Sequence, residues 1–446
     1  MIVEVLRRLK SQGAMLAVGA VAALTWTAAS TAPAMAQSDG VFKIGVIGFL
    51  SGPAAESFGI PSVNTAKMLA EKLNAGGVPA PYATKGIGGK KIELVVIDEG
   101  AGGTKVIEGF RNLVERDHVD AVVGPIASGN CLALAPIAEE LKQFTILSDC
   151  GTPQVFEARS YDYVFRAGAH GTMDNVSLVL YLRDKGVKFD TFSTINQKYA
   201  YGQDALADFR ASLDVVMPGR TLKSELWPTF GAGQYGAEIS ALQKDRADLI
   251  YSSLWGGDLQ AFVLQAAPRG LFKESQLALM AAAHVLPALG NKMPDGVIMG
   301  ERGATGLLAR PSPLNDWFWK TYVEAFKQIP ASSSAYRMAQ SLFGLKIAAE
   351  KAMKLNGGKN PSSQELAAAM TGLEWDAPAG RIRMALGKGH QAIQDAAVGR
   401  TKWDAQHKMV TLIDIKYYDA DCVNPPEGVK SIDWIKSGFK GAKCSQ

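Results

Sequence analysis

The chain has 446 residues, of which 47% are hydrophobic and 20% are charged, and its formal net charge is +4. This length exceeds one ordinary domain, so we expect two lobes with ample core. Charged residues are scattered and form no basic tract, which excludes the electrostatic signature of a nucleic-acid-binding protein.

The N-terminal segment predicts export. Three basic residues within 7–10 precede an apolar run at 14–29, and Ala-Met-Ala at 34–36 offers a small-x-small cleavage site. A membrane anchor is the alternative, but the apolar run is short and rich in alanine. We therefore predict a signal peptide at residues 1–36, cleaved on export, which leaves a mature chain with a formal charge of +2.

Short apolar runs typical of strands then alternate with amphipathic helical stretches. The predicted strands lie at 42–49, 91–98, 119–124 and 143–148, and the helices between them at 63–77, 104–117 and 130–142. This alternation predicts a parallel β-sheet with right-handed crossovers.

The same alternation restarts without a detectable sequence repeat. Strands are predicted at 163–170, 189–195, 222–228, 247–254 and 276–282, with helices at 174–186, 203–213, 237–245 and 258–268. After Gly300 come long helices at 313–328 and 333–355, and then strand-like segments at 381–386 and 408–418. We predict an α/β protein with two Rossmann-like parallel-sheet lobes.

Function is expected in the loops that follow the strands, because ligands of open parallel sheets bind outside the carboxyl ends of the strands. The first, third and fourth of these loops read FLSGPAAESFG, GPIASGN and LSDCGTP. They are built from small and hydroxyl residues above helix N-termini, whose free N–H groups favour an anion.

No motif indicates catalysis or a cofactor. The first loop matches neither the dinucleotide nor the P-loop pattern, and Ser128 lacks a nucleophile elbow. The five histidines show no metal-ligand spacing. Asp98 and Glu99 end the second strand as a candidate catalytic pair, although solvated loop carboxylates are commoner. We expect no enzyme activity, no cofactor and no metal.

The four cysteines fall into two neighbouring pairs, Cys131 with Cys150 and Cys422 with Cys444. No C-x-x-C spacing is present, so a redox or zinc motif is not indicated. An exported protein meets an oxidising compartment, and we predict two structural disulfides, with free buried thiols as the alternative.

Several segments together resemble the periplasmic solute-binding proteins of ABC importers, in the branched-chain amino-acid binding family. They include IGVIGFLSGPAAESFG, DAVVGPIASGNCLALAPIAEE, YAYGQDALADF and AYRMAQSLFGLKIAAEKA, in the family's order. The resemblance implies a type I periplasmic binding fold, with two lobes joined by a three-strand hinge around a ligand cleft. It assigns residues 41–167 with 301–393 to lobe 1, and 168–300 with 394–446 to lobe 2. It also implies a monomer that delivers ligand to the permease subunits of an ABC importer.

The resemblance also assigns ligand contacts in lobe 1. Ser51 belongs to the Ser-Gly-Pro turn at the cleft mouth, and Phe58 lines the side-chain pocket. Ser128 bonds the ligand carboxylate, and Cys150 and Thr152 supply further donors. The alternatives are a core position for Phe58 and helix capping for Ser128 and Thr152.

In lobe 2, the resemblance places two aromatic residues, Tyr201 and Trp255, over the ligand. A cap role for Tyr201 and a core position for Trp255 are the alternatives.

One position departs from the family. A Glu normally faces the ligand ammonium after the strand at 276–282, but here the sequence reads AAAHVL, with Ala283 or His284 in that place. A buried ammonium without a partner carboxylate costs about 2–5 kcal/mol. We therefore predict a small carboxylate ligand with an aromatic or apolar body, with His284 available to a second acidic group. Asp258 or Glu301 could approach the cleft instead.

Two alternatives remain for the function. One is a branched-chain amino-acid receptor of the same transporter type. The other is a ligand-sensing module that is not coupled to transport.

Overall fold

The computed structural model describes residues 40–444. The predicted signal peptide at residues 1–36 lies outside this range. Among the described residues, no helix is long and apolar enough to cross a membrane.

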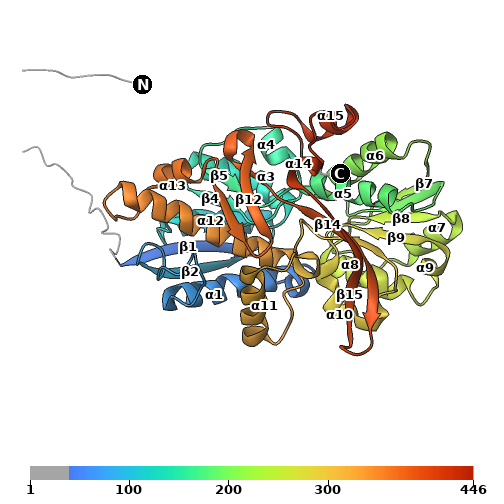
Figure 1. Ribbon diagram of the computed structural model, residues 1–446, viewed down its shortest axis with the longest axis horizontal. Coiled ribbons are helices and arrows are strands. Elements are labelled where there is room, and N and C mark those ends of the chain that lie inside the picture. Colours follow the sequence, from blue (N-terminus) through green and yellow to red (C-terminus); the bar gives the residue numbers. More distant parts are fainter. Residues whose placement is uncertain (1–39, 445–446) are drawn as a thin grey trace, which may run out of the picture. The chain divides into compact units, whose positions relative to one another are not determined.

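The first sheet has eight strands in the order β11-β12-β13-β5-β4-β3-β1-β2. The strands are β1 (Val41–Gly48), β2 (Lys91–Asp98), β3 (Ala121–Val123), β4 (Thr145–Leu147), β5 (Val164–Arg166), β11 (Glu374–Ala377), β12 (Gly380–Leu386) and β13 (Gln391–Ile393). Strands β1 to β5 and β13 pair in parallel, whereas β11 and β12 add antiparallel pairs at one edge. In Figure 1, the blue strand β1 and the orange strand β12 belong to this one sheet although more than 300 residues separate them.

The second sheet has seven strands in the order β15-β14-β10-β9-β8-β6-β7. They are β6 (Thr191–Ile195), β7 (Thr221–Leu226), β8 (Leu249–Ser252), β9 (Gln276–Leu279), β10 (Ile298–Gly300), β14 (Ala396–Asp404) and β15 (Met409–Tyr418). The chain passes between the two sheets three times, after β5, after β10 and after β13.

Helices connect the parallel strands and cover the sheets. They are α1 (Ile60–Ala75), α2 (Gly103–Glu115), α3 (Ser128–Glu140), α4 (Gln154–Glu157), α5 (Gly171–Asp184), α6 (Ala200–Val216), α7 (Gly236–Asp245), α8 (Gly256–Ala266), α9 (Leu271–Glu274), α10 (Leu286–Leu289), α11 (Pro313–Phe326), α12 (Ser333–Leu355), α13 (Ser363–Met370), α14 (Ala420–Val423) and α15 (Ser431–Lys436). Helix α1 ends where Gly76 adopts φ 72°, a left-handed conformation that costs glycine little.

The hydrophobic core follows the two sheets. The largest cluster joins β1 and its neighbours to α1 and α12, and two further clusters pack on the second sheet. A small cluster combines side chains that follow strands of both sheets, among them Phe58, Ile126, Tyr201 and Trp255. Burial of these aromatic rings favours contact between the two halves of the molecule.

The α/β class and the two sheets agree with the sequence analysis, and α12 occupies the predicted residues 333–355. The pattern does not reveal β10, β11, β13 or β14. Strands β10 and β13 have three residues each, too few to show a period, and they lie outside the regular alternation of apolar runs and helices that marks the equally short β3, β4 and β5. The lobe boundaries taken from the resemblance stay a prediction.

Candidate functional site

A small cavity lies where loops from both sheets meet. Its lining residues are Phe58, Ile126, Ser128, Gly151, Tyr199, Tyr201, Trp255, Ala281 and Arg302. Each follows the carboxyl end of a parallel strand, the edge at which open α/β sheets bind ligands. The cavity volume is about 10 Å³, which is close to the space of one water molecule.

Aromatic side chains form most of the wall. Phe58 lies in a π-helical turn before α1, and its ring is 5.1 Å from that of Trp255 in an edge-on arrangement. The indole Nε1 of Trp255 donates a hydrogen bond to Tyr199 Oη at 2.7 Å. Tyr201 completes the wall, and its buried hydroxyl has no hydrogen-bond partner in the structure. Apolar faces with a few polar tips suit a flat organic ligand.

Ser128 contributes a hydroxyl to the cavity. It is the first residue of α3 and is 2% exposed. Its Oγ accepts a hydrogen bond from the Thr152 N–H at 3.2 Å, so the hydroxyl proton stays available for an acceptor. The side chain therefore both braces the neighbouring loop and presents a donor.

Arg302 supplies the positive charge of the cavity. It follows β10, forms an ion pair with Asp149 through Nη1, and lies 3.3 Å from Asp174 through Nε. Its guanidinium carbon is 4.8 Å from the centre of the Tyr201 ring. Burial lowers the pKa of Arg302, but Asp149, Tyr201 and Asp174 together hold it well above its usual value, so the group stays charged. Burial also raises the pKa of Asp174 to about 7, against the opposing effect of Arg302.

Sequence reasoning missed Arg302, Tyr199, Gly151, Ile126 and Ala281. Arg302 follows a strand of only three residues, and its partner Asp149 is 153 residues away, so no local pattern marks it. Tyr199 stands two residues before Tyr201, and the clustering of aromatic residues there was the available signal.

Three predicted ligand contacts lie outside the cavity lining, with their polar groups already bonded. Ser51 is exposed, and its Oγ donates to Asp98 at 2.6 Å. The Cys150 N–H donates to the Ile126 carbonyl, and its sulfur is in a disulfide. The Thr152 hydroxyl donates to Asp204 at 2.5 Å. A direct ligand contact by these three residues stays a prediction.

His284 also lies outside the lining, behind Phe58, with the two rings 5.1 Å apart. Its Nε2 accepts from the Gly256 N–H at 2.8 Å, and its Nδ1 is 3.6 Å from Glu301. Glu301 also accepts a hydrogen bond from the Ala283 N–H, while its Oε1 is buried and has no partner in the described part of the chain. A carboxylate thus reaches the AAAHVL segment from a different strand end.

Asp258, the other carboxylate considered for the cleft, is bonded elsewhere. It accepts hydrogen bonds from Gln197 and from the Gly231 N–H, both at 2.7 Å.

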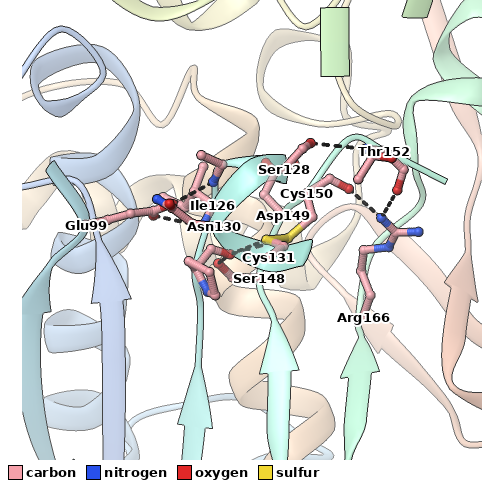
Figure 2. The surroundings of a disulfide bond; sticks show 12 residues. Glu99, Ile126, Ser128, Asn130, Cys131, Ser148, Asp149, Cys150, Thr152 and Arg166 are labelled. Carbon is pink, nitrogen blue, oxygen red and sulfur yellow. Dashed lines mark hydrogen bonds between the residues drawn. A yellow bond between two sulfur atoms is a disulfide. The ribbon is translucent and has the colours of Figure 1, made fainter. Parts of the chain in front are cut away.

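Glu99 is not a solvated loop carboxylate, and that interpretation is wrong for this residue. It is 1% exposed and accepts hydrogen bonds from the Ile126 N–H, the Ala127 N–H and Asn130 (Figure 2). Burial raises the pKa of Glu99 to about 7. Its bonds hold the turn that leads into Ser128, so Glu99 positions the cavity wall.

Both predicted cysteine pairs are bonded in the structure. Cys131 and Cys150 have Cα atoms 6.3 Å apart and link the first turn of α3 to the loop after β4 (Figure 2). Cys422 and Cys444, with Cα atoms 4.5 Å apart, link α14 to the end of the described chain. Within residues 40–444, no group of three or more side chains is arranged to hold a metal.

Two α/β sheets whose loops meet around a cavity define a two-lobed binding protein. The family model described as periplasmic binding protein matches residues 41–408, and the chain belongs to this family.

Two curated relatives match about half of the chain. An amino acid binding protein of Pseudomonas aeruginosa is 27% identical over 228 residues, and a leucine-specific-binding protein of Salmonella typhimurium is 24% identical over 236 residues. Each match covers 51% of this chain and 58% of the relative, so the chain spans little more than half the length of these relatives.

Solved structures share the fold along most of the chain. A solute-binding protein of an ABC transporter from Rhodopseudomonas palustris, in complex with 3,4-dihydroxybenzoic acid, has a TM-score of 0.73 and 23% identity. That comparison covers 85% of this chain and 98% of the other. A leucine-binding protein from Thermotoga maritima has a TM-score of 0.68 and 17% identity, covering 84% and 98%.

Proposed function

We propose that this protein is an extracytoplasmic, non-catalytic receptor that delivers a small carboxylate to the permease of an ABC importer. The observation that carries the proposal is the cavity itself, which combines an aromatic wall with the cation Arg302 and the hydroxyl of Ser128. Membership of the periplasmic binding protein family supports the receptor role. The leader predicted at residues 1–36 supports export through a cleaved signal peptide.

An aromatic acid suits the cavity better than an amino acid. No carboxylate belongs to its lining, so an ammonium group would be buried without a partner, which costs about 2–5 kcal/mol. Each aromatic contact with Phe58, Trp255 or Tyr201 contributes about 0.5–1.5 kcal/mol beyond burial. Two relatives of the same fold, from Rhodopseudomonas palustris, are complexes with 3,4-dihydroxybenzoic acid and with benzoate.

A branched-chain amino acid is the second candidate, and Glu301 is the observation that favours it. One carboxylate oxygen of Glu301 is buried close to the AAAHVL segment and has no partner within the residues that the structure describes. The relatives named for leucine binding support the same candidate.

Calorimetric titration with 4-hydroxybenzoate and with leucine distinguishes the two candidates. We expect 4-hydroxybenzoate to bind at least tenfold more tightly than leucine, and Glu301→Gln to leave that order unchanged. Tight leucine binding that Glu301→Gln abolishes would overturn the aromatic-acid proposal. Loss of 4-hydroxybenzoate uptake in cells that lack the protein would separate a transport role from sensing.

A further inference from the structure

A second cavity of about 200 Å³ lies apart from the candidate site and shares no lining residue with it. Its walls come from residues 153–160 after β4, the end of β5, the turn between β12 and β13, and residues 425–430. It therefore joins the first sheet to the C-terminal segment beside the last crossing between the sheets.

Arg166, the last residue of β5, supplies a buried cation to this cavity. The side chain is 0% exposed. Its Nη1 donates to the carbonyl oxygens of Cys150 and Thr152 at 2.6 Å each, and its Nε donates to Gln391. The remaining nitrogen, Nη2, is buried and has no hydrogen-bond partner among residues 40–444. Figure 2 shows this nitrogen pointing away from the two carbonyl groups.

No described carboxylate lies within ion-pair distance of Arg166, and its other hydrogen bonds go to neutral oxygens. Burial, together with Arg302 and Arg337, lowers the pKa of Arg166 to about 9, so it remains charged at neutral pH. Glu157 and Asp149 favour the charged form of Arg166, but neither forms an ion pair with it among residues 40–444, and an anion at Nη2 would stabilise the buried cation further.

A second donor comes from His170. Its Nδ1 accepts from the Thr172 N–H at 3.3 Å, which places the proton of the neutral ring on Nε2. Burial and the nearby arginines hold the pKa of His170 well below its usual value, so the ring stays neutral.

The rim and walls define the charge and shape of a ligand. Lys388 and Lys430 are exposed on the rim and form no ion pair among residues 40–444. Two carboxylates line the same cavity: Glu157 accepts from Ser431 at 2.9 Å, and Glu427 accepts from the Lys388 N–H at 2.7 Å. The three cations Arg166, Lys388 and Lys430 outnumber these two carboxylates, so the cavity has a net charge of +1, which suits a monoanion. The apolar walls are Pro153, Phe156, Leu386 and Pro425.

We propose that this cavity is a second binding site, for a small organic monocarboxylate held by Arg166 Nη2 and His170 Nε2 and attracted by Lys388 and Lys430. The site stands independently of the receptor function proposed above. The two sites are nevertheless close neighbours, because Arg166 also holds the carbonyl groups on either side of Gly151, which lines the first cavity. A carboxylate in the second site would steady this loop.

Calorimetric titration of the mature protein with sodium benzoate tests the proposal. Two binding events are expected, one of which weakens at least threefold in Lys388→Met/Lys430→Met and disappears in Arg166→Gln. The matched control Lys67→Met/Lys244→Met removes the same charge from exposed positions away from both cavities and is expected to match the wild type. Circular dichroism identifies any variant that fails to fold.

The outcomes separate this site from the first one. Ser128→Ala is expected to weaken the other binding event and to spare this one. Sodium phosphate and acetate are expected to bind more weakly than benzoate, because they leave the apolar walls unused. A single binding event that the Lys388 and Lys430 changes leave unaltered would overturn the proposal, as would equal weakening by the control pair.

Discussion

At the scale of single residues, Ser128 and Gly151 are the two positions of the cavity wall with the narrowest requirements. Ser128 accepts a hydrogen bond from the Thr152 N–H and still presents its own proton to the cavity. Gly151 lines the cavity where a Cβ atom would collide with the ring of Tyr201 and the guanidinium of Arg302. The close approach of the two lobes at this point therefore requires glycine.

Two serines of the sequence analysis can be told apart by substitution. We expect Ser128→Ala to weaken carboxylate binding about tenfold to a hundredfold, since a hydrogen bond to a charged group contributes about 1.5–3 kcal/mol. Ser51→Ala is the comparison: Ser51 is exposed, bonds to Asp98 and lies outside the lining, so a loss of affinity in this variant would support its predicted ligand contact. Calorimetry with 4-hydroxybenzoate measures both variants. Equal affinity of Ser128→Ala and the wild type would show that Ser128 does not contact the ligand.

Asp208 predicts a pH dependence of stability. It is buried between α5 and α6, accepts a hydrogen bond from Thr172 at 2.6 Å, and burial raises its pKa to about 8. The unfolded chain releases this proton near pH 4, whereas the folded protein keeps it up to about pH 8. The contribution of Asp208 to the free energy of unfolding is therefore present below pH 4 and is lost as pH rises to about 8.

The variant Asp208→Asn isolates this contribution, because Asn keeps the acceptor oxygen and does not titrate. We expect the free energy of unfolding of the variant to fall less than that of the wild type between pH 5 and pH 8. Urea unfolding at both values measures the difference. Parallel pH profiles for the two proteins would contradict the raised pKa.

At the scale of secondary-structure elements, three strand ends of the first sheet are tied together beside the cavity. Glu99 after β2 bonds the turn before α3, and the Cys131–Cys150 disulfide joins α3 to the loop after β4. These links hold the backbone around Ser128 and Gly151 before any ligand arrives, which lowers the entropy lost on binding.

The two disulfides have different expected effects on binding. They close loops of similar length, with sequence separations of 19 and 22, so loss of either is expected to cost about 3 kcal/mol of stability. Cys131→Ser/Cys150→Ser is also expected to weaken 4-hydroxybenzoate binding, because it frees the loop at the cavity. Cys422→Ser/Cys444→Ser serves as the control. Thermal unfolding and calorimetry measure the two effects, and equal losses of affinity would contradict the positioning role.

At the scale of the whole molecule, contacts between the two halves close the cavity. Phe58 packs on Trp255, Thr152 bonds Asp204, and the Gly257 N–H donates to the Pro53 carbonyl at 2.8 Å. A cavity that holds benzene has about 150 Å³, far more than the 10 Å³ found here. A carboxylate ligand can therefore enter only after the aromatic wall opens.

Small-angle scattering tests this opening. We expect the ligand-free protein to populate an open form, and a saturating aromatic acid to decrease the radius of gyration, because a ligand that contacts both halves stabilises the closed form by its differential affinity. A matched titration with a non-binding neutral alcohol controls for solvent effects. An unchanged radius of gyration with bound ligand would rule out closure by hinge motion.

The amino-acid sequence by itself determined the α/β class, the order of the main strands and helices, the two cysteine pairs, and four side chains that reach the cavity: Phe58, Ser128, Tyr201 and Trp255. Hydrophobic periodicity and turn residues act over a few neighbouring positions, so they can be detected along the chain. The four side chains were assigned by the resemblance to the binding-protein family, and each stands in or beside a loop that follows a strand.

Only the tertiary structure decided which polar groups remain available in that cavity. Arg302 reaches it by pairing with Asp149 and Asp174, 153 and 128 residues away, and Glu301 reaches His284 from another strand end. The structure likewise shows that Glu99 is buried and accepts a hydrogen bond from the Ile126 N–H, in the loop before Ser128. Ion pairs and desolvation depend on distances in space, and the packing of the two sheets sets those distances.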